Sequence, residues 1–255
     1  MEIVILGSGN VATHLAKAFR KHGHPIKQVF SKQSANANAL ADAVKAEPIS
    51  NLADLDTGAD LYLIAVSDAA ISQIISEMPE ITRGIVVHTS GATPIEVLQR
   101  FDKAGVIYPA QSISKHIEID ISLIPFGIEA NSLETSALLF NLLSPIATGI
   151  FSCDSKQRLA LHVSAVLVNN FPNALFSMAQ KILESENMDF DLLRPIILET
   201  ANKVQNHLPT EVQTGPAARN DMDTINRHLQ FLSYSNELTQ IYQHLSDFII
   251  KSRHK

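Results

Sequence analysis

The chain has 255 residues, of which 45% are hydrophobic and 18% charged, and its formal net charge is −6. This composition is typical of a globular protein with one large or two modest domains, and the acidic balance argues against a nucleic-acid or anionic-membrane surface. Cys153 is the single cysteine and the ten histidines are scattered, so the sequence excludes an internal disulfide and predicts no metal site.

The first predicted element is a strand that begins almost at the initiator methionine and ends at Gly7-Ser8-Gly9. Apolar residues at helical spacing follow, and G-x-G-x-x-A between a strand and a helix is the dinucleotide fingerprint. Gly7 permits the tight turn, Gly9 lets a pyrophosphate approach the backbone, and Ala12 keeps the helix close to the strand. The N–H groups at the helix start carry the positive end of the helix dipole. We therefore expect the pyrophosphate to contact Gly7, Ser8, Gly9, Asn10 and Val11. The alternative is a glycine turn that only joins two packed elements.

A second strand is predicted over residues 25–31, and its end lies about 20 residues past the glycines. NAD-binding proteins place an acidic residue there for the ribose 2′-hydroxyl. This sequence has Ser31-Lys32-Gln33-Ser34 instead. Ser31 and Lys32 could hold a 2′-phosphate, so the cofactor prediction is NADP(H) rather than NAD. The alternative is that Lys32 is an ordinary surface lysine.

Strands and helices then alternate up to residue 152, which predicts a doubly wound parallel sheet, the Rossmann form of the α/β class. The predicted strands lie near 48–49 and over 60–66, 85–87, 105–109, 126–130 and 149–152. Helices are expected over 34–44, after Asp68 as N-cap, after Pro94, and over 133–143. Ligands bind beyond the carboxyl ends of such strands. Further cofactor contacts are therefore expected from the strand-end residues Val66, Ser67 and His88.

From Asp154 onward the pattern is helical, with helices predicted over 155–185, 190–205, 221–232 and 236–251. The predicted domains are a nucleotide-binding domain, 1–153, and an all-helical substrate and dimerisation domain, 154–255. A helical domain of this size often completes its core against a second copy, so we expect a homodimer. The alternative is an apolar helix that packs within its own subunit.

The most apolar later stretch, 159–179, contains a histidine, three asparagines and a proline. It is too polar for a comfortable membrane span and is predicted to be a helix buried in protein. No basic segment precedes the first strand, so no signal peptide is expected. These observations predict a cytoplasmic protein without a membrane partner.

Three polar residues of the first long helix, His162, Asn169 and Asn173, fall within roughly 20° of one another at 100° per residue. On an otherwise apolar helix they could orient a carbonyl or a nicotinamide amide. His162 could also donate a proton. The alternative is an asparagine contact across an interface, or one to the Val168 carbonyl that Pro172 frees.

Two loops offer further candidates. In the loop before the third helix, Thr214 and Gly215 leave free backbone donors, Arg219 could clamp a carboxylate, and Asp221 could orient that arginine or cap the helix. The structural alternative is that Asp221 only caps the helix and pairs locally with Arg219. After the 85–87 strand, Ser90 is expected near the nicotinamide end, although Ser90-Gly91 could simply form a turn.

Several motifs together resemble a known family, the Rossmann proteins that carry a helical C-terminal domain of formerly unknown function. The motifs are Gly7–Ala12, His88–Gly91, Tyr108–Gln111, Asn169–Phe171 and Thr214–Asp221. That family is similar to ketopantoate reductases, pyrroline-5-carboxylate reductases and deazaflavin-dependent NADP oxidoreductases. The resemblance implies an NADP-linked reductase and an intimate dimer. Ketopantoate reductases of the best-known type use a lysine on the early helix of the second domain. Here Lys156 and Arg158 precede that helix's apolar core and His162 occupies its polar face, so that assignment does not transfer.

The sequence therefore predicts an NADP-dependent reductase of a small oxo acid, similar to ketopantoate reductase. His162, or a water that it holds, would supply the proton, Arg219 would bind the carboxylate, and Asn169 and Ser90 would orient the reacting group. One alternative is an imine reductase similar to pyrroline-5-carboxylate reductase. The other is a non-catalytic NADP sensor or scaffold, because a fold alone does not establish turnover.

Overall fold

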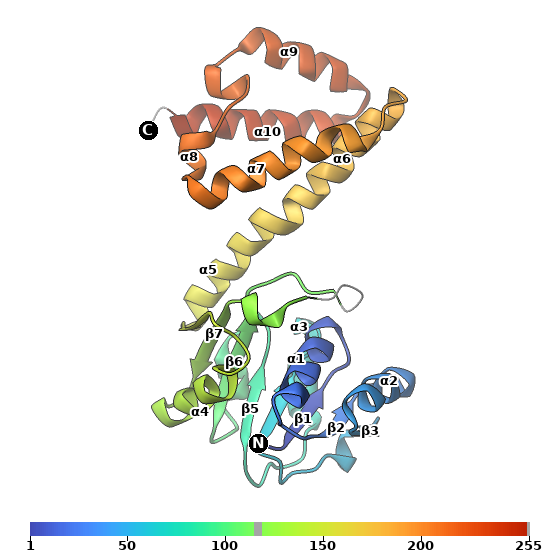
Figure 1. The fold of residues 1–255 in the computed structure, drawn as a ribbon, viewed down its shortest axis with the longest axis vertical. Coiled ribbons are helices and arrows are strands. Elements are labelled where there is room, and N and C mark those ends of the chain that lie inside the picture. Colours follow the sequence, from blue (N-terminus) through green and yellow to red (C-terminus); the bar gives the residue numbers. More distant parts are fainter. Residues whose placement is uncertain (115–118, 254–255) are drawn as a thin grey trace. The chain divides into compact units, whose positions relative to one another are not determined.

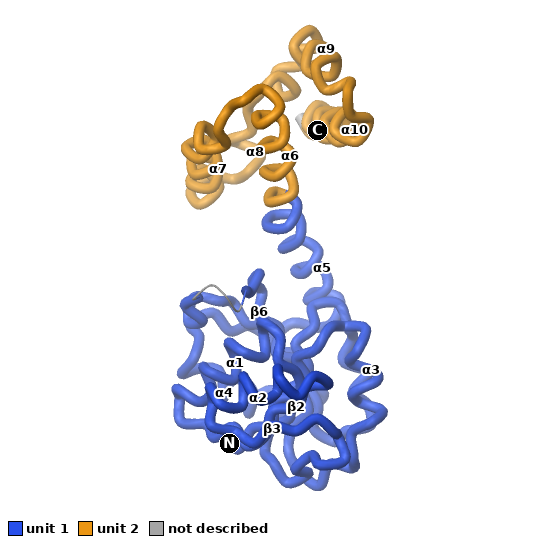
Figure 2. Tube along the Cα trace, turned by 90° about the vertical axis from the view of Figure 1, so that its right-hand side faces the viewer, with its two compact units in different colours: residues 1–171 blue, residues 172–255 orange. Residues whose placement is uncertain are grey.

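The computed structural model describes residues 1–114 and 119–253, and the chain forms two compact units, Met1–Phe171 and Pro172–Lys255 (Figure 2). The predicted domain boundary after residue 153 stays a prediction.

Unit 1 is built on an eight-stranded sheet with the strand order β3-β2-β1-β4-β5-β6-β7-β8 (Figure 1). The strands are β1 (Ile3–Leu6), β2 (Ile26–Phe30), β3 (Glu47–Ile49), β4 (Leu61–Ile64), β5 (Ile85–His88), β6 (Ala104–Pro109), β7 (Phe126–Ala130) and β8 (Ile150–Ser152). The α/β class and the Rossmann order of the first six strands are confirmed.

One pairing departs from the predicted parallel sheet, because β7 runs antiparallel to β6. The connection between them contains no crossover α-helix in its described residues, only the short 3₁₀ turn η3 (Ile121–Leu123). An antiparallel neighbour needs no crossover helix, whereas a parallel neighbour does.

Alternate residues of each strand point to opposite faces of the sheet, so both faces present apolar side chains. Helices cover both faces and bury these side chains in two separate cores. Ile3 and Ile5 of β1 pack in one core with α1 (Asn10–Lys21), α2 (Ser34–Val44) and α4 (Leu133–Leu143). Val4 and Leu6 face the other core, with α3 (Asp68–Glu77) and the 3₁₀ turn η2 (Ile95–Leu98). Each large apolar side chain that is fully buried here contributes about 1.5–3 kcal/mol.

Two local predictions in unit 1 were wrong. The helix expected after Pro94 is only the one-turn η2, because the chain turns towards β6 soon after Leu98. The N-cap of α3 is Ser67 rather than Asp68, which is the first helical residue. Its carboxylate in the first turn still complements the helix dipole.

The long apolar helix is continuous over Ser155–Ser185 but not uniform. It consists of α5 (Ser155–Ala165), the π-helical segment η4 (Val166–Asn170) and α6 (Phe171–Ser185). Pro172 lacks an N–H and its ring crowds the carbonyl four residues earlier, which accounts for the widened turn just before it.

This helix is long and apolar enough to cross a bilayer by length and composition, with a mean hydropathy of 1.3, and none of that window is buried. The predicted burial of this helix in protein is therefore not provided by the single chain. The core helix of a soluble protein passes the same test of length and composition. The four polar side chains His162, Asn169, Asn170 and Asn173 fit a bilayer core poorly.

Unit 2 is helical, as predicted. Besides α6 it contains α7 (Arg194–Asn206), α8 (Pro209–Val212), α9 (Met222–Phe231), α10 (Asn236–Arg253) and the 3₁₀ turns η5 (Phe190–Leu193), η6 (Ala217–Arg219) and η7 (Leu232–Tyr234). Its buried apolar side chains among the described residues are few, namely Ala217, Ile225 and Leu232. Many large apolar side chains of this unit remain exposed in the single chain.

Candidate functional site

The carboxyl ends of the central strands stop level with one another, which creates the edge where the candidate site lies. Leu6 of β1 is opposite Phe30 of β2 and Ile64 of β4, and Ile64 is opposite His88 of β5. The loops that follow these four residues therefore start side by side at one edge of the sheet. Parallel sheets bind their ligands at this edge.

Gly7 makes the first of these loops possible. Its φ is +128°, and a Cβ there would lie 2.2 Å from the carbonyl oxygen of Ala65. The Gly7 N–H donates to the carbonyl of Phe30 at 2.9 Å, which ties the turn to β2. Only glycine combines this backbone conformation with so close an approach.

A cavity of about 490 Å³ opens over the glycine turn. Its described lining consists of Gly7, Ser8, Gly9, Asn10, Val11, Phe30, Ser31, Lys32, Ala65, Val66, Ser67, Ala70, Ile74, Thr89 and Ile113. Nine of the ten residues predicted to contact the cofactor are in this set. A Cβ on Gly9 would meet nothing within 4 Å, so the protein alone does not require glycine there. A ligand that approaches the backbone does, and the glycine turn thus fits a dinucleotide pyrophosphate.

At the end of β2 the cavity is lined by two serine hydroxyls and one lysine. Ser8 Oγ donates to Ser31 Oγ at 3.0 Å, and Lys32 Nζ donates to Gln73 Oε1 at 2.8 Å. None of the described lining residues carries a carboxylate. These residues fit a ribose 2′-phosphate, since Lys32 offers a positive charge and the neutral Gln73 leaves that charge uncompensated.

His88, the last residue of β5, does not line the cavity as predicted. This side chain is fully buried, its Nδ1 accepts the Ser90 N–H at 3.2 Å, and burial lowers its pKa to about 4. The residue that lines the cavity is Thr89. Ser90 Oγ in turn accepts the N–H groups of Ala92 and Thr93, at 3.1 and 2.8 Å. Both side chains therefore shape the loop rather than extend from it.

Arg158 is the residue that sequence reasoning missed. It is fully buried, and its Nη1 donates to the carbonyls of Ser90, Gly91 and Thr93 at 2.9, 3.3 and 2.8 Å. Its Nη2 donates to Glu129 Oε2 at 2.7 Å and to Ser155 Oγ at 3.0 Å. A buried cation persists only when it is paired and hydrogen-bonded in this way. Arg158 therefore ties the loop after β5 to α5 and β7.

His162 lies one helical turn after Arg158 and packs on the same loop. A Cβ on Gly91 would be 2.6 Å from His162 Cγ, so the imidazole rests directly on that glycine. Tyr108, at the end of β6, places its hydroxyl 3.2 Å from His162 Nδ1, with the two rings edge to face at 81°. The structure thus brings His162 together with the Ser90 loop, as the proposed site requires.

The roles predicted for Asn169 and Arg219 stay predictions. Asn169 is exposed and lies in η4, whose wider turn breaks the 100° count that placed it with His162. Arg219 belongs to unit 2, where it is exposed in η6. Asp221 caps α9 by accepting from Thr224 N at 3.1 Å and Thr224 Oγ1 at 2.8 Å, which lowers the pKa of its carboxyl.

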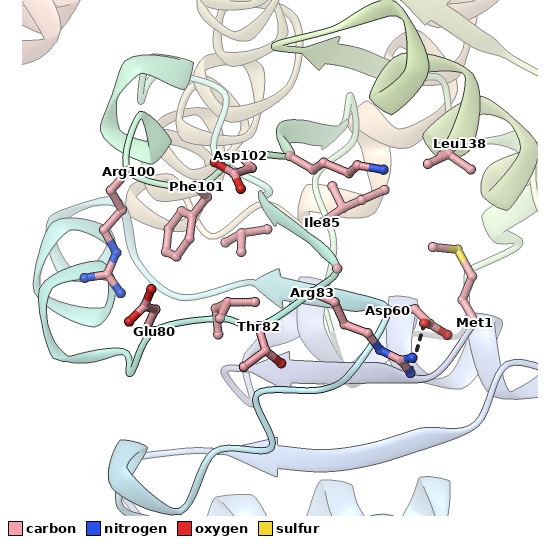
Figure 3. Close-up of a pocket in the computed structure, with 14 residues that line it drawn as sticks. Met1, Asp60, Glu80, Thr82, Arg83, Ile85, Arg100, Phe101, Asp102 and Leu138 are labelled. Carbon is pink, nitrogen blue, oxygen red and sulfur yellow. Dashed lines mark ion pairs between the residues drawn. The ribbon is translucent and has the colours of Figure 1, made fainter.

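A larger cavity, of about 910 Å³, lies at the opposite edge, where Met1, Asp60, Gly84 and Lys103 precede their strands (Figure 3). The Arg83 guanidinium there lies 3.4 Å from the Asp60 carboxylate, and the dashed line in Figure 3 marks this ion pair. The amino ends of parallel strands are not where such folds bind nucleotides, so the smaller cavity is the candidate site.

Comparison with known proteins supports this architecture. The Rossmann-like domain family matches residues 1–111, and a domain of unknown function, DUF2520, matches residues 124–249. A Bacteroides fragilis protein provisionally described as an NADP oxidoreductase is 38% identical, with a TM-score of 0.92 over 98% of each chain. No curated protein matches the sequence significantly.

Two more distant solved structures share the fold. The protein TM1727 of Thermotoga maritima is 19% identical, with a TM-score of 0.75 over 99% of this chain and 100% of its own. A reductive aminase of Aspergillus terreus, in complex with NADPH and ethyl-5-oxohexanoate, is 15% identical, with a TM-score of 0.73 over 98% of this chain and 94% of its own.

Proposed function

The chain belongs to the family of Rossmann-like proteins that carry the DUF2520 helical domain, and from that membership we propose that it is an NADP-dependent oxidoreductase that reduces a C=O or C=N group. The observation that carries the proposal is the cavity over the glycine turn, with Ser31 and Lys32 at its β2 side and no carboxylate in its described lining. Gly7 to Val11 would hold the pyrophosphate, and Ser31 and Lys32 the 2′-phosphate.

NADPH, when bound, supplies the hydride, and the chain's own residues orient the substrate and provide the proton. Arg158 and His88 fix the Ser90 loop, and the loop supports His162 through Gly91. We assign the proton to His162, or to a water that it holds, because an imidazole can exchange protons near neutral pH. Ser90 contributes through the loop that it shapes. Binding of a substrate carboxylate by Arg219 and orientation by Asn169 stay proposals.

Two substrate classes fit this scheme. The first is a small oxo acid, as for ketopantoate reductase. The second is an imine such as pyrroline-5-carboxylate, which is favoured by the shared fold with reductive aminases and imine reductases. Steady-state NADPH oxidation with ketopantoate, with pyrroline-5-carboxylate and with a panel of small oxo acids separates them. Tight NADPH binding without turnover on any of these substrates would instead indicate a sensor or scaffold.

His162→Ala gives the matching test of the site. We expect turnover to fall by about 10²–10⁴-fold, the usual range for a lost acid–base group, while NADPH affinity changes little. Unchanged turnover would remove His162 from the mechanism.

The helical region supports a homodimer. The large apolar side chains that the long helix exposes are Leu159, Val163, Leu167, Val168, Phe171 and Leu175, and a second copy of the chain would bury them. Val168 is 76% exposed, so Val168→Asp should convert the dimer to a monomer in size-exclusion chromatography with light scattering. The control is Leu133→Asp on α4, 91% exposed, which should leave the dimer intact. A monomeric wild type would contradict the proposal.

A further inference from the structure

Tyr108 faces His162 at the edge of the candidate site, and neither the predicted site nor the comparisons give it a role. Its side chain is only 5% exposed, and its hydroxyl lies 3.2 Å from His162 Nδ1. Among the described residues, this is the hydrogen bond that the Tyr108 hydroxyl makes. The position of Tyr108 is fixed by β6, where it pairs with Gly127 of β7.

We infer that Tyr108 is a positioning residue that donates its hydroxyl proton to His162 Nδ1 and so holds the imidazole in the tautomer with hydrogen on Nε2. This inference rests on the proposed role of His162 as the proton source. Nε2 has no protein partner among the described residues, and the ring is partly exposed. A hydrogen-bond donor is therefore available to the oxygen or nitrogen of the group being reduced.

The direction of the Tyr108–His162 hydrogen bond follows from which buried polar group each of the two tautomers leaves without a partner. If Nδ1 carried the hydrogen, the buried phenol O–H would be left without an acceptor, whereas the chosen tautomer leaves only an oxygen lone pair unused. A phenol O–H is also a stronger hydrogen-bond donor than an imidazole N–H. A bare imidazole nitrogen is likewise a stronger acceptor than a phenol oxygen. Burial raises the pKa of Tyr108, opposed by the Arg158 charge, so the phenol keeps its proton at neutral pH.

The same bond completes the proton balance. Loss of the Nε2 hydrogen to the substrate heteroatom would otherwise leave an imidazolate. With the phenol on Nδ1, the phenol proton moves to Nδ1 as the Nε2 proton leaves, and the resulting phenolate takes up a proton from solvent. The substrate gains one proton, the ring stays neutral and Tyr108 is restored.

The test is the ¹⁵N signature of the His162 ring in the full-length protein, recorded by long-range ¹H–¹⁵N correlation about two pH units above the ordinary histidine pKa of about 6.5. We expect a protonated Nε2 and a bare Nδ1 whose shift shows an accepted hydrogen bond. In Tyr108→Phe the Nδ1 signal should move towards that of a free bare nitrogen. The control is Tyr242→Phe, which removes the hydroxyl of the edge-to-face pair with His228 in unit 2 and should leave the His162 signals unchanged.

A protonated Nδ1 in the wild type, or a Nδ1 signal that Tyr108→Phe does not move, would overturn the inference. Both readouts are independent of turnover, so they leave the proposed reductase activity to its own assay. Where a substrate has been found, Tyr108→Phe should lower kcat about tenfold, the equivalent of one net hydrogen bond, with an unchanged KM for NADPH. An unchanged kcat would also contradict the role given to Tyr108.

Discussion

A methyl group at position 91 would collide with the His162 imidazole. A Cβ there would lie 2.6 Å from His162 Cγ, 2.7 Å from Nδ1 and 2.8 Å from Cβ. Carbon atoms in contact are normally about 3.5–4.0 Å apart, so the ring or the loop would have to move by roughly 1 Å. Overpacking of this kind costs about 1–3 kcal/mol. Because the φ of Gly91 is not positive, this cost is steric rather than a backbone effect.

We therefore expect Gly91→Ala to lose about 1–3 kcal/mol in urea unfolding, and to lose turnover because His162 is displaced from Tyr108. Its matched control is Gly9→Ala, since a Cβ at Gly9 meets nothing within 4 Å and its φ is −77°. Gly9→Ala should keep its folding stability but bind NADPH more weakly by tenfold or more, about 1.4 kcal/mol. A Gly91→Ala variant with wild-type stability and turnover would refute the described packing of His162.

Three further predictions concern charge. Lys32→Asp should weaken NADPH binding by about 10–100-fold, the range for a lost charge-assisted hydrogen bond, and weaken NADH binding much less, with exposed Lys17→Asp as the control. Arg158→Met should cost about 3–5 kcal/mol in urea unfolding because it leaves the Glu129 carboxylate without its cation, and adding Glu129→Gln should recover part of that loss. His88, with its folded pKa lowered to about 4, stabilises the fold fully above pH 6.5. By pH 4 it should lose roughly 3 kcal/mol, a pH-dependent loss that should be missing from His88→Gln.

Each of these predictions has a clear contrary result. Equal losses of NADPH and NADH affinity in Lys32→Asp would remove the 2′-phosphate assignment. If Glu129→Gln recovers nothing in the Arg158→Met background, the ion pair does not hold the loop. If wild type and His88→Gln lose stability in parallel between pH 6.5 and 4, His88 is not a buried neutral group in the folded protein.

Most of unit 1 was predictable because its signals are local. The apolar run before Gly7 and the turn chemistry at Gly7 and Gly9 depend on residues adjacent in sequence. The antiparallel direction of β7 was not predictable, since the sequence of Phe126–Ala130 predicts a strand but not whether it runs parallel or antiparallel to its neighbour. The one-turn helix after Pro94 shows the same limit: a proline marks a helix start but not its length.

The site was harder to predict because its contacts join distant segments. Arg158 appeared only as a charge ahead of an apolar helix, and nothing local indicates that its guanidinium reaches three carbonyls near residue 91. His88 lies at a strand end, as a ligand residue would, yet its ring turns into the protein. The shared face of His162 and Asn169 assumed a regular α-helix, and the π-helical turn before Pro172 removed that assumption.

The central claim is that the cavity over Gly7 and Gly9 holds NADP(H). Isothermal titration of the wild-type protein with NADPH and with NADH tests it most directly. The claim predicts one NADPH site per chain and an NADH affinity lower by tenfold or more, about 1.4 kcal/mol. Absence of binding by either nucleotide, or equal affinities for the two, would contradict it.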